Sequence, residues 1–180
     1  MQAPFLIGHH IYLRPLQRAD APAFVQWMND PEVTRTLVHR GPINLQAEEE
    51  FIDRLTRDEH ALPLAIVRRA SDELIGATGL HAIDWRNRHA CFGIALAKAE
   101  WGKGYGREAT AMLVRHAFET LNLNRVWLQV YEYNQRGLRA YEKVGFKKEG
   151  VLRQDNFREG RYWDTIIMAI LREEWHPANT

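Results

Sequence analysis

Hydrophobic residues recur with two different periods along the chain, and the changes of period divide it into predicted strands and helices. The stretch 10–16 is predicted to be a first strand, because its apolar run is broken by a proline. Asp20 follows as the predicted N-cap of a helix over 21–28. Asn44 is the predicted N-cap of a second helix. The positions of this second helix that are predicted to face inward are Phe51, Ile52 and Leu55.

The middle of the chain changes to the period of strands. The stretches 62–69, 73–84 and 88–96 are predicted to be three strands joined by short turns. Helical spacing returns after a cluster of glycines, and it indicates a helix with one buried face. The positions on that face are Ala109, Met112, Leu113, Ala117 and Leu121.

The last third of the chain predicts a strand, a helix and a hairpin. The apolar run 124–131 is predicted to be a strand buried on both faces. Asn134 begins the predicted helix, and Gly145 stands where a left-handed C-cap belongs. The remaining residues predict a β-hairpin that turns at 158–160.

The order of these elements is β-α-α-β-β-β-α-β-α-β-β. It predicts an α/β (α+β) fold in which helices flank a mixed, mostly antiparallel sheet. One βαβ crossover connects the strand 88–96 to the strand 124–131. No repeat, low-complexity segment or linker interrupts the pattern, so residues 1–180 are predicted to form a single domain.

Composition narrows the class of protein. A charged fraction of 26% and a net charge of +1 are typical of a soluble globular protein and favour neither nucleic acid nor a membrane as a partner. The beginning lacks the basic region of a signal peptide, and no stretch reaches the roughly 18 apolar residues of a membrane helix. Cys91 is the only cysteine, which fits a reducing compartment. We therefore expect a cytoplasmic monomer or homodimer without a metal site.

The sequence WGKGYG (101–106) places three glycines between a predicted strand and a predicted helix. Glycine costs about 0.5–1 kcal/mol relative to alanine in regular structure, so the cluster indicates backbone that side chains would obstruct. A helix N-terminus presents unpaired N–H groups that suit a phosphate, and Lys103 and Arg107 add positive charge. The cluster therefore predicts a cradle for a nucleotide-like pyrophosphate, with a glycine turn that binds no ligand as the alternative.

Two common phosphate loops do not match this pattern. A Walker loop needs Ser or Thr after its lysine, where this chain has Gly104. A dinucleotide-binding fold places its glycines after the first strand, whereas here they follow the fourth predicted strand. Downstream, Asn134 ends a strand and Tyr141 lies two helical turns further along. Taken alone, Asn134 is more often only a helix cap, and Tyr141 is more often only a half-buried aromatic residue.

Together, the two segments resemble the GNAT superfamily of acyl-CoA-dependent N-acyltransferases. The pyrophosphate loop of that family follows Gln/Arg-x-x-Gly-x-Gly/Ala; Gly104 and Gly106 match it, while Trp101 stands where Gln or Arg is usual. The segment VYEYNQRGLRAYEKVGF is similar to the family's Asn-x-x-Ala/Gly-x-x-x-Tyr-x-x-x-Gly-Phe signature. The opening IYLRPLQRADAPAFVQWMNDPEV and the tail EGVLRQDNFREGRYWDTIIMAIL resemble the branch of ribosomal-protein alanine N-acetyltransferases and polyamine acetyltransferases.

The resemblance implies a GNAT-like fold whose sheet is splayed at a cleft for acetyl-CoA, the cosubstrate. It implies that Asn134 binds the pantetheine arm, that Tyr141 acts at the thiol, and that the stretch 92–96 offers a backbone amide to the oxyanion. The implied cofactor-binding residues are Phe92, Gly93, Ile94, Ala95, Leu96, Gly102, Lys103, Gly104, Tyr105, Gly106, Arg107, Asn134 and Gly137.

Acetyl transfer from a thioester to an amine requires a proton to leave nitrogen and another to reach sulfur. A phenol with a pKa of about 10 is a suitable acid for a thiol near 8.5, so Tyr141 is the predicted catalytic acid. Many relatives carry a glutamate as the base at the position that aligns with Cys91, which we expect to be a chemically silent apolar residue. We expect the solvent to remove the amine proton, with His81, Asp84 and His89 as alternatives.

The predicted function is direct N-acetylation of a primary amine by acetyl-CoA. A protein or peptide N-terminal α-amine is favoured, because a pKa of about 7.7–8.0 leaves a fair fraction neutral. The alternatives are a small amine such as a polyamine or aminosugar, a longer acyl-CoA donor, and a non-catalytic acyl-CoA sensor. By the resemblance, the residues in segments lining an acceptor groove are Trp27, Asp30, Glu32, Trp85, Asp155, Tyr162, Trp163 and Asp164.

Overall fold

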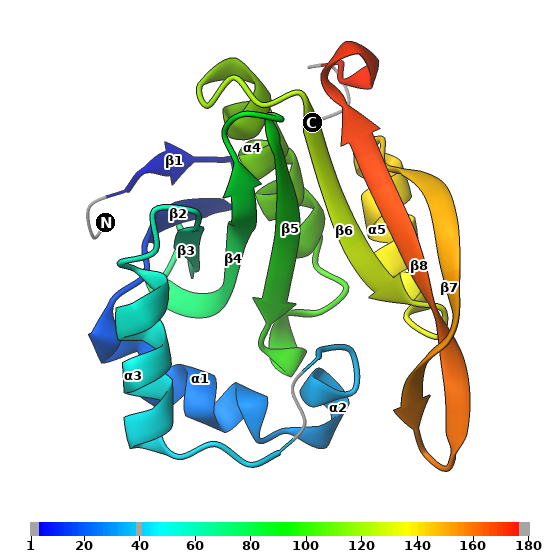
Figure 1. Ribbon diagram of the computed structural model, residues 1–180. Helices are drawn as coiled ribbons and strands as arrows, with labels where there is room; N and C mark the ends of the chain where they lie inside the picture. Colours follow the sequence, from blue (N-terminus) through cyan, green and yellow to red (C-terminus); the bar gives the residue numbers. More distant parts are fainter. Residues whose placement is uncertain (1–3, 39–40, 177–180) are drawn as a thin grey trace.

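The computed structural model describes residues 4–38 and 41–176, which form one eight-stranded sheet with helices on both faces (Figure 1). The strands lie in the order β1-β2-β3-β4-β5-β6-β8-β7. The strands are β1 Leu6–Ile7, β2 Ile11–Pro15, β3 Leu62–Arg68, β4 Glu73–Asp84, β5 His89–Leu96, β6 Arg125–Tyr131, β7 Lys147–Arg158 and β8 Arg161–Leu171. The helices are α1 Ala21–Met28, α2 Pro31–Thr34, α3 Leu45–Leu55, α4 Tyr105–Glu119 and α5 Gln135–Val144.

The topology confirms the predicted mixed, mostly antiparallel sheet. Every neighbouring pair of strands is antiparallel except β5 and β6, which run parallel and are connected through α4. This pair is the predicted βαβ crossover. The sequence pattern missed β1 and α2, which have two and four residues and are therefore too short to display a period.

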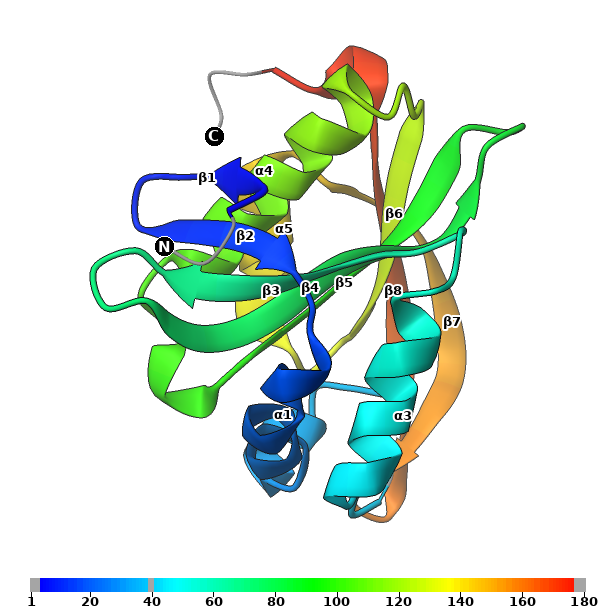
Figure 2. The same cartoon turned by 90° about the vertical axis from the view of Figure 1, so that its left-hand side faces the viewer.

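The sheet has α4 and α5 on one face and α1 and α3 on the other (Figure 2), and an apolar cluster lies on each face. The larger core lies against α4 and α5, and it includes Leu113 and Phe118, which are fully buried. A smaller cluster lies under α1 and α3 around Phe24 and Ile52. Each fully buried side chain of this kind contributes about 1.5–3 kcal/mol to stability. The two apolar clusters hold β4 and β5 in place. Where the clusters leave gaps along these strands, cavities border the sheet.

Most predicted helix ends are confirmed, but Asp20 has a different role from the one expected. The Asn44 side chain accepts a hydrogen bond from the Ala47 amide at 2.9 Å, and Gly145 ends α5 with φ +111°. Asp20 occupies the N-cap position of α1, yet its carboxylate accepts two hydrogen bonds, of 2.7 and 2.8 Å, from the buried Arg14 guanidinium. This ion pair fixes the start of α1 to β2.

Two predictions about burial are wrong. Strand β6 alternates between buried and more exposed positions, with Leu128 and Val130 buried but Gln129 exposed, because one of its faces borders an opening in the sheet. Phe51 is 46% exposed, because its neighbour Ile52 is the residue that α3 turns toward the sheet. Phe51 instead borders a cavity, which is described below.

Candidate active site

The sheet opens between β5 and β6. These two strands pair only from His89 to Cys91, whereas β5 stays paired with β4 as far as Leu96. Beyond Cys91 the two parallel strands diverge, as Figure 1 shows toward the lower ends of both arrows. A cavity of about 580 Å³, here called the cleft, is lined by residues of both diverging strands. This opening is the splay that the sequence implied.

The cleft brings together nearly all of the predicted site residues. All five residues of the stretch 92–96 line it, as do Asn134, Gly137 and Tyr141. From the glycine segment, the lining residues are Gly102, Gly104, Gly106 and Arg107. Lys103 and Tyr105 do not line the cleft. The Lys103 ammonium lies 3.3 Å from a carboxylate oxygen of Glu100, and the Tyr105 ring packs against the main core.

The glycine segment has the backbone that its composition predicted. Gly102 and Gly104 have φ values of +77° and +90°, in the left-handed region where side chains are strained. At Gly106 the constraint is space rather than backbone conformation, since a Cβ there would lie 3.3 Å from the Leu96 side chain. Gly104 is the N-cap of α4 and gives no side-chain cap, so the first amides of the helix are free to bind an anion.

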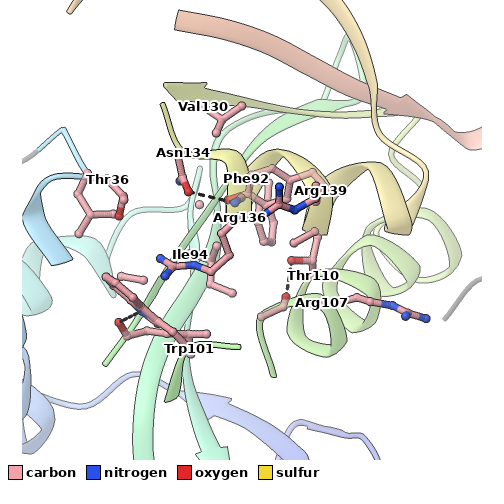
Figure 3. A pocket seen from close by; sticks show the side chains of 18 of the residues that line it. Thr36, Phe92, Ile94, Trp101, Arg107, Thr110, Val130, Asn134, Arg136 and Arg139 are labelled. Carbon is pink, nitrogen blue, oxygen red and sulfur yellow. Dashed lines mark hydrogen bonds between the residues drawn. The ribbon is translucent and has the colours of Figure 1, made fainter. Parts of the chain in front are cut away.

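An arginine that the sequence analysis missed lies across the cleft from the glycine segment. The Arg136 guanidinium, from α5, stacks on the Trp101 ring at 3.5 Å from its centroid (Figure 3). The Trp101 indole N–H donates to the Leu96 carbonyl at 3.0 Å, which holds the ring at the end of β5. Arg136 therefore places a positive charge beside Trp101, which occupies the position where Gln or Arg is usual. With Arg107 and Arg139, three arginines line the cleft.

Arg136 carried a sequence signal that was overlooked. It lies two residues after Asn134, inside the quoted signature segment. Desolvation lowers its pKa, but a guanidinium stays charged throughout the physiological range. A cation near a phosphate loop is recognisable only when the two segments are known to face each other.

Asn134 serves as a helix cap and as a wall of the cleft. Its carboxamide oxygen accepts a hydrogen bond of 3.0 Å from the Gly137 amide (Figure 3). A Cβ on Gly137 would lie 2.7 Å from the Asn134 side-chain nitrogen, so any larger residue would require the carboxamide to shift. The capping oxygen fixes the orientation of the carboxamide, and its N–H₂ group remains as a donor for a ligand in the cleft.

Tyr141 lines the cleft from α5 and packs against aromatic neighbours. Its ring meets Phe92 edge-on, with centroids 6.1 Å apart, and lies 6.0 Å from Phe146. Burial raises the pKa of Tyr141 to about 12. The hydroxyl therefore keeps its proton at physiological pH and can donate it, or a hydrogen bond, to a departing sulfur.

The candidate bases are separated by the structure. The His89 Nε2 atom lies 3.9 Å from the Asp84 Oδ2 atom, beside the turn between β4 and β5. Neither residue lines the cleft. His81 does line it, as does Cys91, its register partner on β5. Burial raises the pKa of the Cys91 thiol to about 11, so the thiolate is scarce at neutral pH.

A second cavity, also of about 580 Å³, lies on the side of β4 and β5 that faces α1 and α3. None of the aromatic and acidic residues expected in the acceptor groove lines the cleft or this second cavity. Trp27 packs against Phe24 in the smaller core cluster, and Glu32 pairs with Lys98 at 2.6 Å. Pairing and packing of this kind depend on tertiary contacts and leave no pattern in the sequence.

Two further findings concern the described residues as a whole. Over residues 4–38 and 41–176, no group of three or more His, Cys, Asp or Glu side chains is placed to hold a metal ion. Over the same residues, no helix is both long and apolar enough to cross a membrane.

Comparison with known proteins relates this geometry to a family. Residues 10–147 match the family described as "Acetyltransferase (GNAT) domain". The chain is 31% identical to an uncharacterized N-acetyltransferase of Bacillus licheniformis, over 94% of this chain and 97% of that protein. It is 30% identical to the spermidine N(1)-acetyltransferase of Vibrio cholerae, over 94% of this chain and 97% of that enzyme.

A solved structure extends the likeness to the fold. The spermidine N-acetyltransferase from Vibrio cholerae in complex with CoA and spermine is 27% identical to this chain. The two superpose with a TM-score of 0.86 over 92% of this chain and 97% of the other. The chain therefore belongs to the GNAT family of acetyltransferases.

Proposed function

We propose that the protein transfers the acetyl group of acetyl-CoA directly to a primary amine, with a peptide N-terminal α-amine as the preferred acceptor. The observation that carries the proposal is the cleft, where the glycine segment, Asn134 and Tyr141 line a single cavity beside the diverging strands. This arrangement offers amides and arginines to a pyrophosphate at one end. It offers a phenol to a thioester further in.

The residues of the cleft have separable roles. The amides at the start of α4, with Arg107 and Arg136, hold the pyrophosphate, because an anion is favoured at a helix N-terminus and beside a guanidinium. The Asn134 carboxamide donates to the pantetheine arm. Along 92–96, β5 has no pairing with β6, so a backbone amide there can donate to the carbonyl oxygen as negative charge develops.

Direct transfer is favoured over an acetyl-enzyme intermediate. A covalent route needs a nucleophile, and the thiol that lines the cleft, Cys91, has its pKa raised to about 11 by burial. The amine therefore attacks the thioester itself. Because Tyr141 has a pKa of about 12, well above that of an ordinary thiol, it stabilises the departing sulfur chiefly by donating a hydrogen bond.

A peptide α-amine is proposed because its ammonium form is a stronger acid than that of an alkylamine. Its pKa of about 7.7–8.0 leaves a fair fraction neutral at physiological pH, whereas an alkylamine near 10.4 is almost wholly protonated. The relatives that act on spermidine make a polyamine the second candidate acceptor.

The experiment that tests the proposal follows thiol release from acetyl-CoA in the presence of a panel of amines. We expect thiol release that depends on the amine, together with stoichiometric acetyl-amine. Acetyl-CoA and CoA should bind tightly in calorimetry, and adenine nucleotides without the pantetheine arm should bind poorly. Tight binding without turnover of any amine would identify a sensor and contradict the proposal.

A further inference from the structure

The second cavity adjoins the cleft. Both cavities are lined by Leu37, Val38, His81, Gly93, Ile94 and Ala95. An acetyl group in the cleft and an amine in the second cavity would therefore meet beside β5. A volume of about 580 Å³ lies within the usual range of small-molecule sites.

The walls of the second cavity are mainly apolar. Helix α1 contributes Phe24 and Met28, α3 contributes Phe51 and Leu55, and the segment after α2 contributes Ile43. Among the described lining residues, the carboxylate of Glu48 and the guanidinium of Arg54 are the ionic groups apart from His81. Glu48 and Arg54 carry charges of opposite sign. The described lining therefore has no net negative charge that would attract a second or third ammonium group.

His81 is the titratable residue that the described linings of the two cavities share. Its ring lies over two glycines that are register partners on β4 and β5. A Cβ on Gly79 would lie 3.3 Å from the imidazole Nε2, and a Cβ on Gly93 would lie 3.2 Å from the same atom. The absence of both side chains makes the room in which this ring lies.

The backbone after His81 is irregular. His81 pairs with Cys91 and Asp84 pairs with His89, so two residues of β4 lie opposite one residue of β5. Ala82, the first residue of this bulge, has φ +47°, a conformation that costs free energy for any residue except glycine. A strained bulge next to a ring held between two cavities is the kind of feature that occurs beside active sites.

We propose that the second cavity binds the acceptor, that it takes a primary amine attached to an apolar group, and that His81 receives the proton that the amine loses. The proposal rests on the acetyl transfer proposed above and names the acceptor class and the base of that reaction. An N-terminal residue with an apolar side chain and a small arylalkylamine present the same chemistry to these walls. A polyamine would place further ammonium groups among mainly apolar side chains, where Glu48 is the one carboxylate among the described lining residues and Arg54 repels a cation.

In the proposed step, one carbon–nitrogen bond forms and one carbon–sulfur bond breaks. The neutral amine nitrogen forms a bond to the thioester carbonyl carbon, and the nitrogen becomes positively charged. The imidazole Nε2 of His81 takes a proton from it. The carbon–sulfur bond then breaks, and the thiolate leaves with a hydrogen bond from Tyr141. The proton on His81 passes to solvent and the thiolate takes one up, so the products are an amide and a thiol.

His81 is suited to be neutral before the reaction. Burial lowers its pKa below the usual 6.5, while the charge of Asp58 acts weakly in the opposite direction. The other titratable groups around it are Cys91 across the strand pair, and Glu48 and Arg54 on α3. The imidazole is therefore an available base at neutral pH, and deprotonation by solvent alone is not required.

The first test compares acceptors. Thiol release is measured with 2-phenylethylamine, a peptide that begins with Phe, the same peptide beginning with Asp, and spermidine. We expect kcat/KM to be at least tenfold higher for one or both apolar amines than for the Asp peptide and spermidine. Activity with the Phe peptide alone would identify a peptide acceptor, and activity with 2-phenylethylamine alone would identify a small one. A preference for spermidine would overturn the inference, whereas no turnover with any amine would contradict the proposed function itself.

A matched pair of variants locates the binding. Phe51→Asp places a charge at the second cavity, and Phe5→Asp makes the same change at a phenylalanine of nearly equal exposure that lines neither cavity. The exposed fractions are 46% and 45%. We expect Phe51→Asp to lower kcat/KM for the apolar amine about tenfold while leaving the Kd for CoA unchanged. Phe5→Asp should change neither value. Equal losses in the two variants would overturn the assignment of the acceptor site.

The second test measures kcat/KM against pH for two amines of different pKa. If both the amine and His81 must be neutral, log kcat/KM rises with a slope of two below the His81 pKa and a slope of one between that pKa and the amine pKa. The steeper limb lies below pH 6.5 for both amines. In His81→Gln the slope is one throughout. A wild-type profile with the single slope of His81→Gln would show that solvent is the base.

Discussion

The cleft and the second cavity have similar volumes and share one wall, but they are built from different parts of the chain. The cleft is formed by backbone: diverging strands, a left-handed glycine segment and the start of a helix. The second cavity is formed by side chains from α1, α3 and the segment between them. In the proposed function, the cosubstrate is thus held chiefly by backbone geometry, whereas the acceptor meets mainly side chains.

The comparison predicts that the largest loss of binding comes from changing the backbone of the cleft. Gly104→Val puts a β-branched side chain at φ +90°, beside the first amides of α4. We expect the Kd for CoA, measured by calorimetry, to rise at least about 100-fold. The matched control is Gly160→Val, which imposes the same strain at φ +78° in the turn of the β7–β8 hairpin. It should lower the Tm and leave the Kd unchanged. An unaltered Kd in Gly104→Val would mean that the segment is only a turn.

The next largest effect concerns chemistry inside the cleft. Tyr141→Phe removes the hydroxyl and keeps the packing against Phe92 and Phe146. We expect kcat to fall by about 10- to 1,000-fold while KM for acetyl-CoA changes little, because the hydroxyl acts after the amine has attacked. Tyr162→Phe, at an exposed tyrosine that lines neither cavity, is the control. Normal turnover by Tyr141→Phe would mean that the thiolate leaves without help.

The same contrast explains what the sequence could predict. Strands β2 to β8, helices α1, α3, α4 and α5 and the crossover followed from period and capping, because each of those signals is local. Gly104, Asn134 and Tyr141, which belong to two motifs of fixed spacing, line one cavity. The opening of the sheet between β5 and β6 was implied by the resemblance alone, since no local pattern marks where two strands diverge.

The acceptor side could not be predicted in this way. Phe51 was expected in the core, because helical spacing cannot distinguish a residue facing a core from one facing a cavity. His81 was one of three equal candidates, and its position over Gly79 and Gly93 required the register of β4 and β5. The aromatic and acidic residues expected in the groove line neither cavity, and composition does not say which surface a side chain borders.

A smaller effect tests whether one side chain supplements the backbone of the cleft. We expect Arg136→Ala to raise KM for acetyl-CoA about five- to tenfold with kcat nearly unchanged, because a cation is lost from the phosphate end. The control is Arg161→Ala, which removes a similar stack, at 3.4 Å over Trp163, outside both cavities. If Arg136→Ala lowered KM, its stacking on Trp101 would instead be an obstacle to binding.

The smallest effect is expected at Cys91, where the cleft borders the strand that also carries the acceptor cavity. Cys91→Ala should change kcat/KM by less than about twofold, because removing one small, partly buried group from a side wall alters neither the amides of the cleft nor the apolar residues of the second cavity. The pH dependence of kcat/KM gives a second test of whether Cys91 acts as a nucleophile. Burial raises the pKa of the thiol to about 11, so a thiolate nucleophile would add a limb to kcat/KM that rises toward pH 11 and vanishes in the alanine variant. We expect the two enzymes to give superimposable profiles up to pH 10, and an alanine variant that lost most of its activity would restore a covalent route through Cys91.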